Sequence, residues 1–169
     1  MTDSPPSPTA PIGSRNEVFT AYLDYYRATV ITTVERMSET DQRRSRLASG
    51  WTPVELLKHL RFVELRWIVW GFEGRDVGYP WGDARDGRWH VDPSESLTEL
   101  VAVLLAQGEH TREVVLAADL SAVGHPGERW EGAEPPTLER VLFHLLQEYA
   151  RHAGHLDIVA ELAAADGPA

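Results

Sequence analysis

The stretch GWTPVELLKHL, residues 50–60, contains the clearest helix start in the chain. Thr52 can act as the N-cap, Pro53 suits the first helical position, and Glu55 completes a capping box three residues after the cap. The leucines and other apolar residues that follow keep helical spacing. We therefore expect a helix that runs through Trp67 and stops near the glycines of residues 71–74.

A second capping box lies downstream of this helix. Ser96 and Glu99 are spaced to open a helix over about residues 97–118. Thr137 is a plausible cap for the last helix, over about residues 138–164.

The first helix is expected over about residues 15–37. Its consecutive β-branched residues, Val30 to Thr32, weaken the local helix propensity, so packing must stabilise it. We expect Arg27 to be a solvated position on this helix, together with Glu35 and Arg36.

Irregular connections join these helices. Residues 74–93, GRDVGYPWGDARDGRWHVDP, and residues 119–136 are rich in Gly, Pro and Asp. No alternating run is long enough to predict a strand. The fold is predicted to be all-α, a four-helix bundle whose long connections allow an order other than simple up-down-up-down.

Composition limits the classes of protein to be considered. With 169 residues and 43% hydrophobic residues the chain can bury one core, and a net charge of -10 argues against nucleic acid as a partner. The chain has no cysteine, so any thiol chemistry needs a thiol from outside. No apolar run approaches the ~20 residues that span a bilayer. We expect a cytoplasmic protein without membrane contact, with a flexible tail over residues 1–14 and a single domain over residues 15–165.

Metal-binding side chains are concentrated near the end of the chain. The stretch HLLQEYARHAGHLD, residues 144–157, spaces His144, Glu148 and His152 at i, i+4 and i+8, so they share one helix face, and His155 falls within the same arc. An i, i+4 carboxylate–histidine pair can close on one metal ion. The alternative is a polar network that buttresses the bundle.

His59 is the candidate third ligand. It shares a side of the second helix with Leu56 and Leu60, where an unpaired imidazole is unfavourable. The alternative is a buried histidine bonded to a backbone carbonyl. Imidazole and carboxylate ligands without thiolates suit zinc, nickel, iron or manganese.

Tryptophan is frequent, with six residues in the chain. Trp89 lies in the first long connection beside Arg88 and His90, and we expect Trp89 and His90 to contact a substrate or to support the ligands. The alternative is that the tryptophans pin long loops onto a small bundle. His110 and His125 carry no pattern and are expected on the surface.

The two quoted stretches together resemble the DinB-like superfamily of four-helix metalloproteins. The resemblance is strongest to the bacterial branch with a GW-x-P-x-E-L-x-x-H-L block and a terminal E-Y-x-R-H-x-G-H-L-D block, and it covers about residues 15–161. The resemblance implies a long crossover between the second and third helices. It also implies a divalent metal held by one histidine on the second helix and an i, i+4 pair on the fourth.

Matched residue by residue, the resemblance assigns the metal ligands as His59, Glu148 and His152. A Glu–His pair in place of the more frequent His–His pair is similar to mycothiol-dependent maleylpyruvate isomerase. His144 and His155 are then expected to support the ligands or contact substrate. Zinc is the expected ion, with nickel or iron as alternatives.

Three functions are compatible with such a site. Relatives imply a transferase that joins a low-molecular-weight thiol such as mycothiol, as cosubstrate, to an electrophilic small molecule. An open metal site also suits a hydrolase. The third function is a metal-binding stress-response module without turnover, because fold does not imply function. A homodimer is a further expectation, since bundles of this kind often pair through helix faces.

Overall fold

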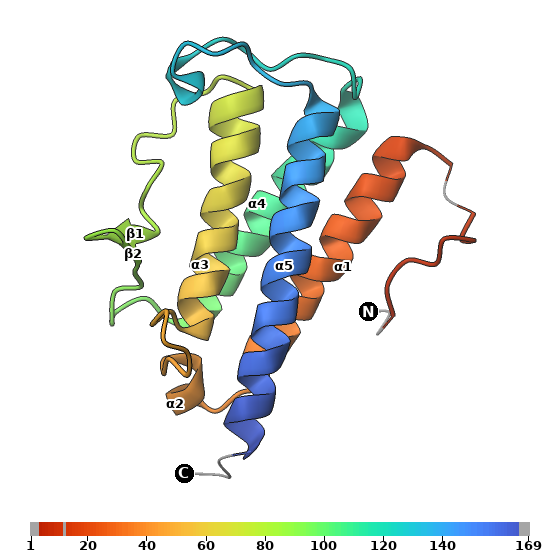
Figure 1. Ribbon diagram of the computed structural model, residues 1–169. Coiled ribbons are helices and arrows are strands. Elements are labelled where there is room, and N and C mark those ends of the chain that lie inside the picture. The colour runs from red at the N-terminus through yellow and green to blue at the C-terminus, as the bar shows by residue number, and fades with distance from the viewer. Residues whose placement is uncertain (1–3, 12, 166–169) are drawn as a thin grey trace.

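The structure, a computed structural model, describes residues 4–11 and 13–165. Within these residues four long helical segments lie side by side (Figure 1). They are α1 (Arg15–Glu35), α3 (Pro53–Glu64) with its continuation η1 (Leu65–Phe72), α4 (Leu97–Ala117) and α5 (Leu138–Ala165). The prediction of an all-α four-helix bundle is confirmed.

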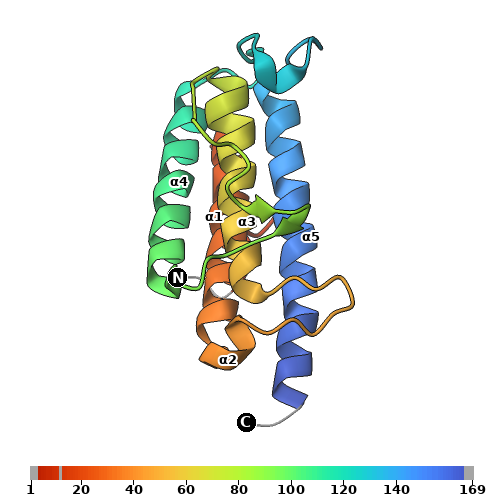
Figure 2. The same ribbon diagram turned by 90° about the vertical axis from the view of Figure 1, so that its left-hand side faces the viewer.

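The order of the helices around the bundle differs from their order in the sequence. α1 packs against α5 and α4, and α3 packs against α4 and α5. The views in Figure 1 and Figure 2 show α3 and α4 running in the same direction. The chain between them must therefore return along the bundle, which confirms the predicted long crossover.

Capping boxes open several of the helices. Glu55 accepts a hydrogen bond from the backbone N–H of Thr52 at 2.8 Å, and Glu99 accepts one from Ser96 at 2.9 Å, as the sequence predicts. A further box at the start of α1 joins Ser14 and Glu17. These local bonds explain why the helix starts agree with the sequence.

Short elements occupy the connections. They are α2 (Glu39–Gln42), β1 (Ala84–Arg85), β2 (Arg88–Trp89) and η2 (Glu128–Trp130). The two strands form a small antiparallel hairpin, where sequence analysis expected none. Its turn residues, Asp86 and Gly87, both have positive φ, which is typical of a two-residue Asp-Gly hairpin turn. The Asp-Gly dipeptide is the feature of the sequence from which this hairpin turn could have been predicted.

Arg27 is buried between the helices, although it was expected to be solvated. Its exposed fraction is 4%, and its guanidinium donates to Glu64 through Nε at 3.0 Å and Nη2 at 2.8 Å. The hydroxyls of Thr111 and Tyr149 donate to the same carboxylate. Glu64, which is fully buried, thus accepts hydrogen bonds from α1, α4 and α5, and it lies on α3.

Gly108 on α4 provides the space for Arg27. A Cβ atom at Gly108 would overlap with Nε of Arg27. The close approach of α4 to the guanidinium explains why a long charged side chain fits between helices.

Among the described residues, none of the helices combines the length and the apolar composition that a membrane-spanning helix requires.

Candidate metal centre

The structure brings His59, Glu148 and His152 together in the space between α3 and α5. One ligand atom from each residue lies within 4.8 Å of the others. Glu148 Oε2 is 3.2 Å from His152 Nε2 and 3.9 Å from His59 Nε2. Two imidazole Nε2 atoms therefore face one carboxylate.

The carboxylate at this centre is ionised. Contacts with His152 and His59 hold the pKa of Glu148 well below its usual range, outweighing the opposite effect of burial. His152 is 9% exposed, so the group is largely shielded from water. The three side chains thus offer two imidazole nitrogens and one anionic carboxylate oxygen to an ion.

Asp83 orients one of the histidines. Its Oδ2 lies 2.9 Å from His59 Nδ1, and Arg66 donates to both oxygens of Asp83, at 2.7 and 3.1 Å. Burial alone would raise the pKa of Asp83, but hydrogen bonds from His59 and Arg66 lower it. Since the ionised carboxylate only accepts, Nδ1 of His59 donates the hydrogen bond, and Nε2 is the ring nitrogen that faces the group.

Asp83 was not predicted from the sequence as a residue of this site. It lies in the irregular crossover, 24 residues after His59. Neither a helix period nor a motif links the two positions, so only the tertiary structure reveals the pair.

Trp89 forms a wall of the centre. Its ring stacks on His59 with the centroids 4.0 Å apart and an angle of 21° between the planes. The same ring meets His152 edge-on at 5.3 Å. The small hairpin is therefore placed so that β2 covers two of the three candidate ligands.

The other histidines lie at different distances from the group. His144 Nε2 is 3.7 Å from Glu148 Oε1, and the His144 ring packs against Trp67 at 4.3 Å. The His155 ring meets His152 edge-on at 5.7 Å. The structure does not bring His90 into the group. Its backbone N–H donates to Asp83 O at 2.8 Å, and its Nε2 is buried without a hydrogen-bond partner in the part of the chain that the structure describes.

Of the histidines expected on the surface, His125 is exposed, whereas His110 is partly buried. His110 Nε2 lies 2.6 Å from Glu73 Oε2. Neither residue belongs to the three-residue group.

A hollow of about 380 Å³ adjoins Trp89 on the outside of the centre. It lies between the start of α3 and the hairpin turn, and it is lined by Trp51 and Trp89, whose tilted rings contact each other with the centroids 6.1 Å apart. The remaining lining residues are Ser49, Gly50, Glu55, Gly87 and Arg88. Tryptophan faces with a few charged groups are typical of small-molecule sites.

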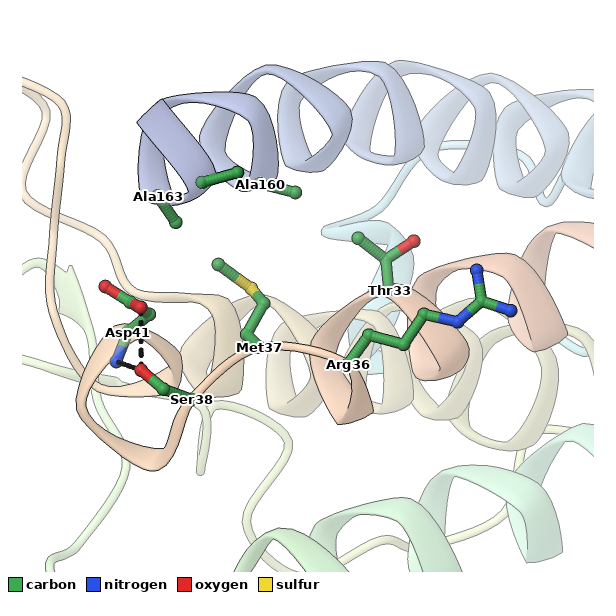
Figure 3. Close-up of a pocket in the computed structure, with 8 residues that line it drawn as sticks. Thr33, Arg36, Met37, Ser38, Asp41, Ala160 and Ala163 are labelled. Atoms are coloured by element: carbon green, nitrogen blue, oxygen red, sulfur yellow. Dashed lines mark hydrogen bonds between the residues drawn. The ribbon is translucent and has the colours of Figure 1, made fainter. Parts of the chain in front are cut away.

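Another hollow, of about 470 Å³, lies at the far end of the bundle. Figure 3 shows its walls, which come from the end of α1, the start of α2 and the end of α5, with Arg36 and Asp41 among the labelled side chains. The Ser38 hydroxyl donates a hydrogen bond of 2.7 Å to the Asp41 carboxylate there. None of its lining residues belongs to the candidate metal centre.

The donor set is suitable for a metal ion. Two imidazoles and one carboxylate with convergent donor atoms are the ligand types of open zinc sites, which leave a coordination position for a further ligand. The hydrogen bond from His59 to Asp83 supplies the supporting contact that metal-binding histidines usually make.

Comparison with known proteins gives one family match. The family model described as mycothiol-S-transferase matches residues 18–165, a range that includes the three candidate ligands. The search of curated proteins found no match to the chain.

Proposed function

This chain belongs to the mycothiol-S-transferase family, and we propose that it uses one divalent metal ion to join a low-molecular-weight thiol to an electrophilic small molecule. The convergence of His59 Nε2, Glu148 and His152 Nε2 within 4.8 Å carries this proposal. Zinc is the ion that we propose, with nickel and iron as alternatives for the same donor set.

When bound, such an ion lowers the pKa of a thiol toward neutral pH, so that the reactive thiolate is present. Only Glu148 among the three ligands is anionic. The site would therefore keep a net positive charge, which favours an anionic sulfur over a neutral one.

The surrounding residues prepare this site. Asp83 fixes the ring of His59 in the tautomer that binds a cation, and Arg66 holds Asp83 in turn. Trp89 shields the His59 ring from water by stacking on it. We place the body of the thiol in the hollow beside Trp89, whose volume of about 380 Å³ is in the range of small-molecule sites.

The proposed reaction also bears on location. A reduced thiol cosubstrate requires a reducing compartment, so we propose that the protein acts in the cytoplasm. We propose that residues 15–165 form the single catalytic domain.

Metal content and cobalt spectroscopy test the centre. We expect about one zinc, nickel or iron per chain in the purified protein, lost in His59→Ala and His152→Ala and retained in the control His125→Ala. Equal metal content in all variants would refute the ligand assignment. In the cobalt-substituted protein, mycothiol should shift the visible absorption bands.

The same spectra separate the proposed transferase from other functions. A bound water that titrates with pH and ignores thiols would favour a hydrolase. A spectrum that neither thiol nor pH changes would indicate a closed binding module. Transfer itself is measured as thiol-dependent loss of an electrophile above the uncatalysed rate, with His152→Ala as the inactive reference.

A further inference from the structure

Arg129, in η2, carries a charge that no described carboxylate balances. The chain has 26 acidic and 16 basic residues, so carboxylates are plentiful. Nevertheless, within residues 4–11 and 13–165 Arg129 forms no ion pair, and its Nε atom is buried without a hydrogen-bond partner. Its guanidinium lies instead over the ring of Trp67, at 4.2 Å from the centroid.

This arrangement leaves the guanidinium partly desolvated. Burial lowers the pKa of Arg129, and the nearby positive charge of Arg66 acts in the same direction, against a smaller opposite effect of Glu131. Stacking on aromatic rings offsets only part of the cost of removing a cation from water. An anion placed against Arg129 would therefore form stronger hydrogen bonds than at an exposed arginine.

The position of Arg129 is well defined. The neighbouring Trp130 donates from Nε1 to the backbone oxygen of His125 at 2.8 Å. Its ring also fills the space left by Gly71, where a Cβ atom would lie 3.0 Å from the indole. η2 is thus fixed against the end of η1, and Arg129 is held over Trp67.

A continuous series of contacts leads from Arg129 to the candidate metal centre. Trp67, which Arg129 covers, packs against His144 with 4.3 Å between the ring centroids. His144 in turn lies 3.7 Å from Glu148. The side of the centre that Arg129 and Trp67 adjoin is distinct from the hollow beside Trp89. Trp67 reaches the centre through His144 and Glu148, whereas Trp89 contacts His59 and His152.

We propose that Arg129 binds the carboxylate of an acidic electrophile, whose apolar body lies against Trp67 while its reactive carbon faces the thiol at the metal centre. The proposal rests on the proposed function, and it defines the class of the second substrate. The carboxylate takes no part in bond changes. The thiolate sulfur forms a bond to the electrophilic carbon, the leaving group departs as an anion, and the thiol proton goes to solvent.

A pair of probes that differ only in charge tests this proposal. We would compare 4-(bromomethyl)benzoate with 4-(bromomethyl)benzamide as electrophiles for mycothiol, subtracting the uncatalysed rate. The absence of cysteine excludes alkylation of protein thiols. Arg129→Gln should lower kcat/KM for the benzoate about ten- to a hundredfold, the range of a hydrogen bond to a charged group, and leave the benzamide within about twofold.

Two further variants separate charge from geometry. Arg129→Lys keeps the charge but loses the planar two-point contact, so it should show an intermediate loss for the benzoate. Arg36→Gln removes an equal charge at the opposite end of the bundle, where Arg36 is exposed, and should change neither probe (Figure 3).

Calorimetric titration with 4-(hydroxymethyl)benzoate, which cannot react, keeps the test independent of turnover. Weaker binding of this acid to metal-loaded Arg129→Gln than to wild type would support the inference even if no transfer occurred. Transfer without any preference for the acid, or an equal loss of both probes in Arg129→Gln, would overturn the inference and leave the transferase function intact.

Discussion

Replacing Glu64 with glutamine should destabilise the bundle strongly. The carboxylate is fully buried and accepts two hydrogen bonds from Arg27, at 3.0 and 2.8 Å. Glutamine keeps the shape, but its amide turns a donor toward groups that are themselves donors. Among the described residues, Asp24 is then the one acidic partner left to Arg27. Breaking one side of a buried ion pair costs about 3–5 kcal/mol.

Urea unfolding, followed by circular dichroism, measures this cost. A domain of this class unfolds with a free energy of about 5–15 kcal/mol and a slope of about 1–3 kcal/mol per M urea. A loss of about 4 kcal/mol should therefore lower the midpoint by roughly 2 M. Glu109→Gln, at an exposed position of α4, is the matched control and should change stability by less than about 0.5 kcal/mol.

A second substitution tests the reason for the loss. Adding Arg27→Met to Glu64→Gln removes the unpaired buried charge, so the double variant should be more stable than Glu64→Gln alone. If Glu64→Gln lost less than about 1 kcal/mol, or if the double variant were the less stable of the two, the interpretation of Glu64 as the carboxylate that balances Arg27 would be refuted.

Three other perturbations have defined outcomes. Asp83→Asn should weaken metal binding about 10–100-fold in chelator competition, because His59 loses its charged partner. The control Asp76→Asn, at an exposed position, should leave the metal affinity unchanged. Equal metal affinities in the two variants would show that Asp83 does not support the ligand His59. Gly108→Ala should lower the unfolding free energy by about 1–3 kcal/mol, because the new methyl group meets Arg27. Gly154→Ala adds a methyl group in open space and should raise the unfolding free energy by about 0.5–1 kcal/mol. The opposite ranking of the two variants in urea unfolding would contradict the packing described. Zinc at a hundred times its dissociation constant should stabilise the wild type by about 2.7 kcal/mol and leave the stability of His152→Ala unchanged, as measured by thermal unfolding. An equal rise of the unfolding temperature in both proteins would mean that the ion binds elsewhere.

The features that short stretches of sequence encode were predicted well. Capping boxes at Thr52 and Ser96 depend on residues three positions apart, and their bonds form as soon as the helix turns. The face shared by His144, Glu148 and His152 follows from the helical period alone. The Asp-Gly turn of the hairpin was equally local, but two-residue strands are too short to show an alternating pattern.

The features that depend on contacts between distant segments could not be predicted in this way. Arginine is a residue type that usually lies in solvent, so the sequence predicts that Arg27 is exposed. Its burial is favourable because Glu64, Thr111 and Tyr149 approach from three other helices. The pairing of Asp83 with His59 depends on the path of the crossover.

Helix starts and the spacing of ligands along one helix are therefore properties of the sequence, because the bonds and angles that cause them span only a few residues. Which charges are balanced, and which guanidinium is left without a carboxylate, is decided by the tertiary structure. Electrostatic free energy depends on separation in space and on burial, and neither quantity is defined until the helices have packed. For this reason the environment of Arg129 is defined only after folding has placed it over Trp67, where it forms no ion pair with a described acidic residue.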